Sequence, residues 1–216
     1  MRLVRLLLLL LVLSGCWVHT ALAERILLFL GDSLTAGFGV EPEQAYPRLL
    51  GDMLAADGLA DIRIVNGGIS GSSSASALSR LQWYKKIQPS VLFLALGAND
   101  GLRGLTMEEM EHNLTAVIEA AKAQGMSIVL AGMELPPNYG QEYTGAFRQV
   151  YRDLAARHTL TLIPFLLEGV GGVAALNQVD GIHPNAEGHR QVARHVYPTL
   201  KAHLERTREQ GAGSRP

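Results

Sequence analysis

The sequence is poor in cysteine and in charged residues. Its 216 residues include one cysteine, Cys16, so a disulfide within the chain is excluded. Charged residues make up 18% of the chain, the net charge is −1, and the basic residues are scattered, which disfavours a nucleic acid as partner. A metal site made from Asp32, Asp180 and His183 would lack a paired histidine or cysteine motif, so we expect no bound metal.

A long apolar run, Leu6–Leu13, lies at the start of the chain. It follows Arg2 and Arg5 and precedes an Ala-Leu-Ala triplet that ends at Ala23. This arrangement is typical of a secretory signal peptide, and the run is shorter than the roughly 20 residues that cross a bilayer. We therefore predict a signal peptide over residues 1–23 and a periplasmic or secreted mature chain.

The tetrapeptide Leu13-Ser14-Gly15-Cys16 provides a competing signal, because it is similar to the lipobox of bacterial lipoproteins. In that alternative, residues 1–15 are removed and acyl chains on Cys16 anchor the protein to a membrane. Cys16 lies ten residues before Ile26, where the first predicted strand begins. Because so short a spacer follows Cys16, we favour cleavage after Ala23.

Short apolar runs alternate with longer helical patterns in the rest of the chain. Near-continuous apolar runs are typical of strands covered on both faces, as in a parallel sheet. The predicted strands are Ile26–Leu30, Ile62–Asn66, Val91–Leu96, Ser127–Ala131 and Leu160–Pro164. The predicted helices are Gln44–Ala56, Ser74–Lys86, Met107–Gln124, Tyr143–His158 and Ala186–Arg206. This alternation predicts one α/β domain over residues 24–208, a three-layer sandwich around a five-stranded sheet, with a flexible tail over residues 209–216.

Four loops gather small and polar residues. Ser33 follows the first predicted strand, Gly71 lies in the loop after the second, and Asn99 follows the third. Asp180 and His183 share a short loop before the last helix. Because the carboxyl ends of parallel strands meet at one edge of a sheet, these residues can converge there although they are distant in sequence.

Ser33, His183 and Asp180 are the residue types of a nucleophile, a general base and an orienting acid. Among seven histidines, His183 is distinguished by Asp180 three residues before it. A plain turn at a helix start is the alternative reading of that pair, and a local turn is the alternative for Ser33. The N–H groups of Ser33 and Gly71 and the amide of Asn99 are candidate donors to an oxyanion. The Gly-x-Ser-x-Gly motif of α/β-hydrolases does not occur.

These residues carry a resemblance to the GDSL, or SGNH, hydrolase family. The segments that resemble its four blocks, in order, are Gly31-Asp32-Ser33-Leu34, Gly71, Gly97-Ala98-Asn99-Asp100 and Asp180-Gly181-Ile182-His183. The resemblance implies a flavodoxin-like sheet of order 2-1-3-4-5 and no metal or organic cofactor. It also implies that Ser33 is the nucleophile, His183 the base and Asp180 its acid, with Ser33, Gly71 and Asn99 as the oxyanion hole.

The same resemblance bears on substrate binding. It implies a mobile loop after Asn99 and contacts to an acyl chain from Leu102, Leu105, Leu135 and Pro136. The chain departs from the family's Gly-Asp-Thr turn, because Ser72 and Ser73 follow Gly71, so a carboxylate is lost from that loop. Asp32 and Asp100 adjoin the candidate site, and we expect both to bond their own backbone.

The sequence as a whole predicts a monomeric serine esterase acting on a small-molecule substrate. We expect hydrolysis of carboxylic esters and thioesters, including acyl thioesters, lysophospholipids and aryl esters. Two alternatives remain open: a carbohydrate O-acetyl esterase of the same fold, and a lipid-binding lipoprotein without catalysis. We expect no nucleic-acid partner, and we expect contact with a membrane only if it supplies the lipid substrate or if Cys16 is acylated.

Overall fold

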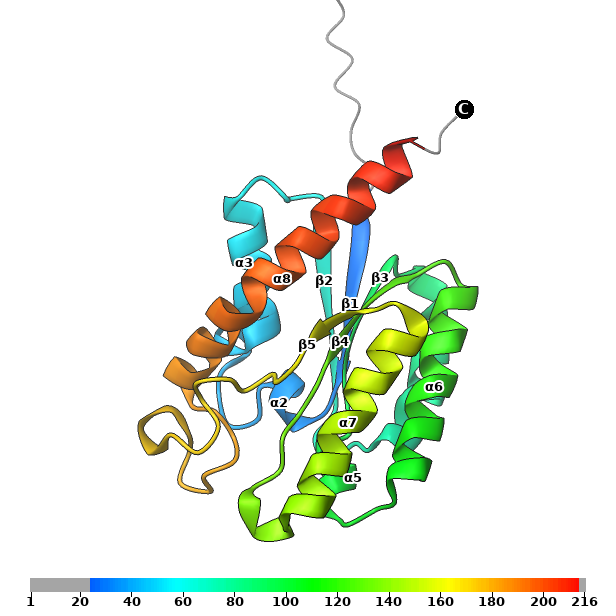
Figure 1. Cartoon of the computed structure of the whole chain (residues 1–216). Coiled ribbons are helices and arrows are strands. Elements are labelled where there is room, and N and C mark those ends of the chain that lie inside the picture. Colours follow the sequence, from blue (N-terminus) through cyan, green and yellow to red (C-terminus); the bar gives the residue numbers. More distant parts are fainter. Residues whose placement is uncertain (1–23, 214–216) are drawn as a thin grey trace, which may run out of the picture.

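The computed structural model describes the backbone of residues 24–213 and the side chains to residue 210. The predicted signal peptide and Cys16 lie outside the described residues. The described chain forms a parallel five-stranded sheet with the order β2-β1-β3-β4-β5, which confirms the predicted fold class and topology (Figure 1). Its strands are β1 (Arg25–Gly31), β2 (Ile62–Gly68), β3 (Val91–Ala95), β4 (Ser127–Ala131) and β5 (Thr161–Ile163).

Helices cover both faces of this sheet (Figure 1). On one face, α3 (Tyr46–Ala56) packs against α8 (Ala186–Gly213). The other face is covered by α4 (Ala77–Tyr84), α6 (Met107–Ala123) and α7 (Gln141–His158), in which α6 packs between its two neighbours. Among the described helices, none combines the length and the apolar character needed to cross a bilayer.

The hydrophobic core lies along the central strands β1 and β3. Both strands are buried on both faces because helices cover the sheet on either side. The rings of Phe29 and Phe93 lie 4.7 Å apart between these strands, and the edge of Tyr46 from α3 packs against Phe29. Burying each such side chain contributes about 1.5–3 kcal/mol. The core therefore makes a rigid base for the loops at the carboxyl edge of the sheet.

Several element boundaries differ from the sequence prediction. Residues Pro42–Gln44 form a separate 3₁₀ turn, so α3 begins at Tyr46. The last helix continues past the predicted end at Arg206 to Gly213, because Glu209 and Gln210 favour a helix, so the first part of the predicted tail is helical. The remaining 3₁₀ turns are Ser74–Ser76, Lys85–Ile87, Pro137–Tyr139 and Ala174–Leu176.

Two short helices at the carboxyl edge were not predicted from the sequence. They are α2 (Ser33–Ala36), directly after β1, and α5 (Ala98–Leu102), directly after β3. The helix α2 begins in the predicted loop of Ser33, and α5 begins in the predicted loop of Asn99. Both helices therefore place candidate site residues at their first turns.

Candidate active site

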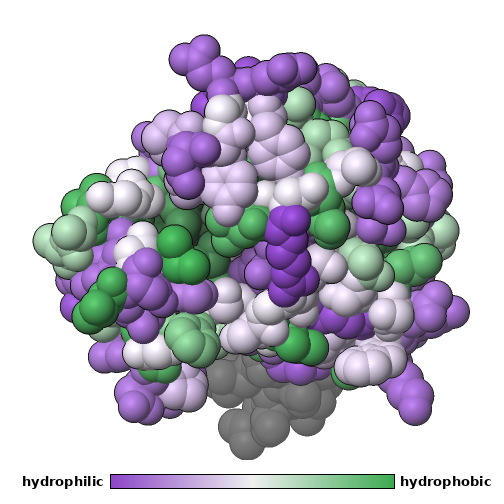
Figure 2. Space-filling model, turned by 90° about the horizontal axis from the view of Figure 1, so that it is seen from below, coloured by the Kyte–Doolittle hydropathy of each residue, from purple (hydrophilic) through white to green (hydrophobic). Residues whose placement is uncertain are grey.

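A cleft of about 620 Å³ lies at the carboxyl edge of the sheet. Figure 2 views this face of the molecule and shows hydrophobic side chains gathered around a hollow. Ser33, Gly71, Asn99 and His183 all line the cleft, so the structure brings these predicted residues to one place. A cleft at this edge is where open α/β sheets bind ligands.

The end of β1 positions Ser33. The Asp32 side chain accepts a hydrogen bond of 3.0 Å from the Leu34 N–H and so caps α2, in which Ser33 is the first residue. A Cβ at Gly31 would overlap the Thr35 side chain, so only glycine allows the helix to start so close to the strand. The local sequence thus places the hydroxyl of Ser33 at the start of a helix, facing the cleft.

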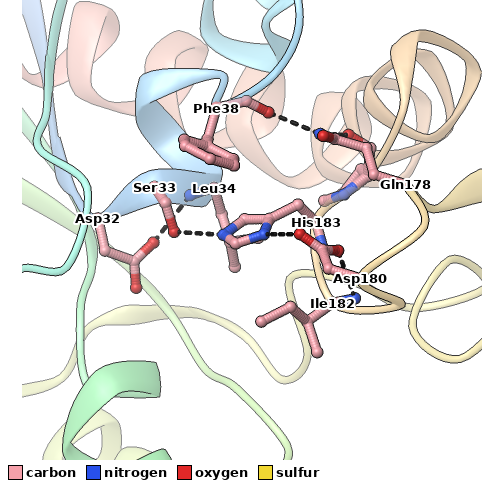
Figure 3. Close-up of polar contacts among 9 residues, drawn as sticks. Asp32, Ser33, Leu34, Phe38, Gln178, Asp180, Ile182 and His183 are labelled. Carbon is pink, nitrogen blue, oxygen red and sulfur yellow. Dashed lines mark hydrogen bonds and ion pairs between the residues drawn. The ribbon is translucent and has the colours of Figure 1, made fainter.

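Ser33, His183 and Asp180 form a continuous hydrogen-bonded chain (Figure 3). The Oγ of Ser33 lies 2.9 Å from Nε2 of His183, and Nδ1 of His183 lies 2.7 Å from Oδ2 of Asp180. The other carboxylate oxygen, Oδ1, accepts the N–H groups of Ile182 and His183 at 3.0 and 3.1 Å. This geometry sets the imidazole to accept a proton from the serine while the carboxylate holds the opposite ring nitrogen.

The same hydrogen bonds keep Asp180 ionised. The bond to the His183 side chain, followed by the two backbone N–H groups, lowers the pKa of Asp180 from 3.8 to about 2. Its carboxylate is therefore charged throughout the neutral range, although it is partly exposed to solvent. An Asp180 in this state stabilises an imidazolium that forms on His183.

Three candidate hydrogen-bond donors belong to residues that line the cleft, namely Ser33, Gly71 and Asn99. Within the described chain, the N–H groups of Ser33 and Gly71 donate to no other protein group, which leaves both free for a ligand. The φ of Gly71 is +77°, a conformation that favours glycine, and its carbonyl accepts a bond of 2.9 Å from Nη2 of Arg103. The Asn99 amide donates to the Ser72 carbonyl at 3.0 Å, and its second hydrogen has only a long contact, 3.4 Å, with Asp32. Because its contact with Asp32 is long, this hydrogen is the one that can be shared with an oxyanion.

Comparison with known proteins identifies the chain. A model of the GDSL-like Lipase/Acylhydrolase family matches residues 29–191. The protein belongs to this family. The match spans the segment from β1 to the first part of α8, and it contains every residue of the hydrogen-bonded chain.

Named relatives support the same assignment for this GDSL hydrolase. Esterase TesA of Pseudomonas aeruginosa is 42% identical over 88% of this chain and 97% of its own length. An arylesterase of Vibrio mimicus is 38% identical over 90% of this chain and 97% of its own. Thioesterase 1/protease 1/lysophospholipase L1 of Escherichia coli is 37% identical over 80% of this chain and 82% of its own. A crystal structure of TesA superposes with a TM-score of 0.80 over 83% of this chain and 99% of that one. The protein is a carboxylic ester hydrolase.

The walls of the cleft in this GDSL hydrolase are mostly apolar. Leu102, Leu135 and Pro136 line it, as predicted from the sequence, but Leu105 does not. The backbone N–H of Leu105 donates to the Asp100 carbonyl, and its carbonyl accepts a bond from the Tyr143 hydroxyl. Further lining residues that the sequence analysis missed are Leu34, Phe38, Met133, Phe165, Leu167 and Ile182. Two of them, Phe165 and Leu167, belong to the apolar segment Phe165-Leu166-Leu167 just after β5. This apolar segment is visible in the sequence and could have predicted a wall of the cleft.

Asp100 and Arg80 are buried residues that support the site without lining the cleft. Both oxygens of Asp100 accept bonds from Ser74, which begins the turn before α4, so Asp100 fixes the loop that carries Gly71. Arg80 of α4 donates from Nη2 to the carbonyls of Gly31 and Gly67, at the ends of β1 and β2. Asp100 therefore has the structural role expected of it, but its partner is a different loop and not its own backbone.

Within residues 24–213, no group of three or more histidine, cysteine, aspartate or glutamate side chains could hold a metal ion. The carboxylate of Asp32 instead bonds to other parts of the protein, because it caps α2 and accepts a long hydrogen bond from the Asn99 amide. Burial raises its pKa from 3.8 to about 6, against the lowering effects of the Leu34 N–H and of His183. Burial of the charged form of Asp32 therefore lowers the free energy of unfolding at neutral pH.

We expect Asp32→Asn to stabilise the fold and to lower activity. A raised pKa means that the native state binds the extra proton, so stability is lost as the pH rises from about 4 to about 6. At pH 8, asparagine should therefore add on the order of 1–3 kcal/mol to the free energy of unfolding. Loss of the negative charge near His183 should lower kcat by about tenfold.

The measurement is urea unfolding of both proteins at pH 8 and at pH 4, with ester hydrolysis alongside. The stability gain should vanish at pH 4, where Asp32 is protonated in the native state and about half protonated when unfolded. Asp52→Asn, at an exposed residue of α3, is the control and should change stability by less than about 1 kcal/mol. Equal stability of Asp32→Asn and the native protein at pH 8 would contradict the expectation.

Proposed function

We propose that this protein hydrolyses acyl esters and thioesters through an acyl-enzyme on Ser33. The hydrogen-bonded chain from Asp180 through His183 to Ser33 carries the proposal. His183 Nε2 takes the proton of Ser33 Oγ as that oxygen attacks the acyl carbonyl. The proton then passes to the leaving alkoxide, aryloxide or thiolate, and the acyl group stays on Ser33.

The second half-reaction reuses the same groups. A water molecule gives a proton to His183 and attacks the acyl-Ser33 carbonyl, and His183 returns the proton to Ser33 as the carboxylic acid leaves. In both halves, negative charge collects on the former carbonyl oxygen. The N–H groups of Ser33 and Gly71 and the amide of Asn99 are placed to stabilise it, and each such donor is worth about 2.7–4 kcal/mol.

The shape of the cleft favours an acyl substrate with an uncharged chain. Its walls combine aliphatic and aromatic side chains from five segments, including Leu102, Leu135 and Phe165. A cavity of about 620 Å³ is of the size that encloses a small-molecule ligand. We therefore propose aryl esters, acyl thioesters and lysophospholipids as substrates, in keeping with the names of the three relatives.

The first residues of the sequence support a proposal for where the enzyme is located. The charged residues before Leu6, the apolar run and the Ala-Leu-Ala triplet support export and release after Ala23. We propose a periplasmic or secreted enzyme, with a lipid anchor on Cys16 as the alternative. Mass spectrometry of the mature N-terminus distinguishes a chain that begins at Glu24 from an acylated Cys16.

Hydrolysis of p-nitrophenyl esters of graded acyl length, together with labelling by a fluorophosphonate, tests the proposal. We expect turnover and a single phosphonyl adduct on the peptide that contains Ser33. Turnover restricted to acetate esters would favour the carbohydrate O-acetyl esterase. Absence of both turnover and adduct would overturn the acyl-enzyme mechanism and favour a lipid-binding role.

A further inference from the structure

Gln178 lies two residues before Asp180, and its side chain crosses from the loop that carries His183 to the segment that carries Ser33 (Figure 3). Its amide nitrogen Nε2 donates to the Phe38 carbonyl at 2.7 Å and to the Pro184 carbonyl at 3.0 Å. One side-chain amide thus uses both hydrogens to join two segments that are about 140 residues apart in sequence.

Both carbonyls are linked directly to the reacting residues. The Phe38 N–H donates to the Ser33 carbonyl at 3.0 Å, so Phe38 is tied to the nucleophile through the turn that ends α2. Pro184 follows His183, and the backbone N–H of Gln178 donates to the His183 carbonyl at 2.8 Å. Gln178 therefore holds His183 from its own loop and also connects that loop to the Ser33 segment.

The opposite segment makes room for this amide. Gly39, which follows Phe38, has a φ of +77°, and a Cβ there would overlap the side-chain amide of Gln178. Most other side-chain bonds of the loop stay inside it. Asn177 donates to the carbonyls of Val170 and Val173, and these bonds shape the loop without fixing its distance from Ser33.

We propose that Gln178 is a positioning residue that holds His183 at hydrogen-bonding distance from Ser33 throughout the reaction. This role rests on the proposed acyl-enzyme mechanism. The direct bond between Ser33 and His183 breaks when the proton moves and Ser33 becomes an ester, so it cannot maintain the distance by itself. The bonds of Gln178 involve no reacting atom and persist through both half-reactions.

Replacement by methionine tests this role, because Gln178→Met keeps the length of the side chain and removes both donors. A misplacement of about 1 Å in an active site can cost 10²-fold, so we expect kcat to fall by about 10- to 100-fold. KM should stay within about twofold, since Gln178 is absent from the residues that line the cleft. The rate of Ser33 labelling by a fluorophosphonate should fall in parallel with kcat.

Gln149→Met is the matched control, because Gln149 is exposed on α7 and donates only to Asp153. Gln178→Glu is the second variant, and it also lacks the two donors while keeping the shape. If Gln178→Met fails to fold, the same loss of kcat in a folded Gln178→Glu protein supports the role. Native kcat and labelling rate in either folded variant would overturn it. Absence of labelling in the native protein would instead overturn the proposed function.

Discussion

Ser33→Ala is expected to lower kcat by about 10⁴- to 10⁶-fold, the largest effect of any single substitution in this protein. Alanine removes the oxygen that lies 2.9 Å from Nε2 of His183, and no other hydroxyl lies within hydrogen-bonding distance of that nitrogen in the described chain. The backbone N–H of residue 33 remains, so the oxyanion donors are retained. Slow residual hydrolysis by water is therefore expected rather than none.

The measurement is kcat on a p-nitrophenyl ester that the native protein hydrolyses, with unfolding followed by circular dichroism. Ser79→Ala is the control, because Ser79 is exposed on α4 and donates only to the carbonyl of Ser76, in the 3₁₀ turn that precedes this helix. Its kcat should equal that of the native protein. A Ser33→Ala protein that is folded and retains more than about 1% of native kcat would exclude Ser33 as the nucleophile.

Much of this site could be predicted from the sequence because it follows from sheet topology. Apolar runs fix the order of strands and helices, and parallel strands bring their carboxyl ends to one edge. That rule predicts that the loops of Ser33, Gly71 and Asn99 converge, and the chemistry of these residues and the family resemblance give their expected roles. Asp180 and His183 were found by their spacing of three residues in a loop, which the structure shows as a turn that Asp180 itself closes.

Two short helices, the position of Leu105 and the contacts of Gln178 could not be predicted from the sequence. Helices α2 and α5 have four and five residues, which is too short for a 3.6-residue pattern to develop. Leu105 is absent from the cleft lining. Sequence spacing gives no information on which side of an irregular loop a side chain lies. The bridge from Gln178 to Phe38 joins residues 140 positions apart, and neither residue type is diagnostic by itself.

Asp180→Asn is expected to lower kcat by about 10⁴-fold while the loop keeps its shape. Asparagine can still accept the N–H groups of Ile182 and His183 through its oxygen, as Oδ1 of Asp180 does at 3.0 and 3.1 Å. Its amide nitrogen would face Nδ1 of His183, where the carboxylate oxygen now lies at 2.7 Å. Because this nitrogen is a donor, it favours the tautomer with the proton on Nε2. His183 then cannot accept the proton of Ser33.

The low pKa of Asp180 excludes its own titration as a cause of pH dependence in the neutral range. The pKa of Asp180 is lowered to about 2, so its stabilising effect is present above about pH 4 and is lost only as the pH falls toward 2. Titration of Asp180 therefore cannot cause a change of native activity between pH 5 and 8. A loss of kcat in Asp180→Asn at neutral pH therefore reports the missing carboxylate and not a change in its titration. Asp153→Asn, at an exposed carboxylate on α7, should retain native kcat.

Comparison with Asp180→Ala completes the argument. Alanine removes the acceptor for the two backbone N–H groups but introduces no donor opposite Nδ1, so either tautomer of His183 remains accessible. We expect Asp180→Ala to be less stable to urea than Asp180→Asn, yet no less active. If Asp180→Asn were several-fold more active than Asp180→Ala, the hydrogen bonds that shape the loop would matter more than the tautomer. The main role of Asp180 would then be to hold the loop that carries His183.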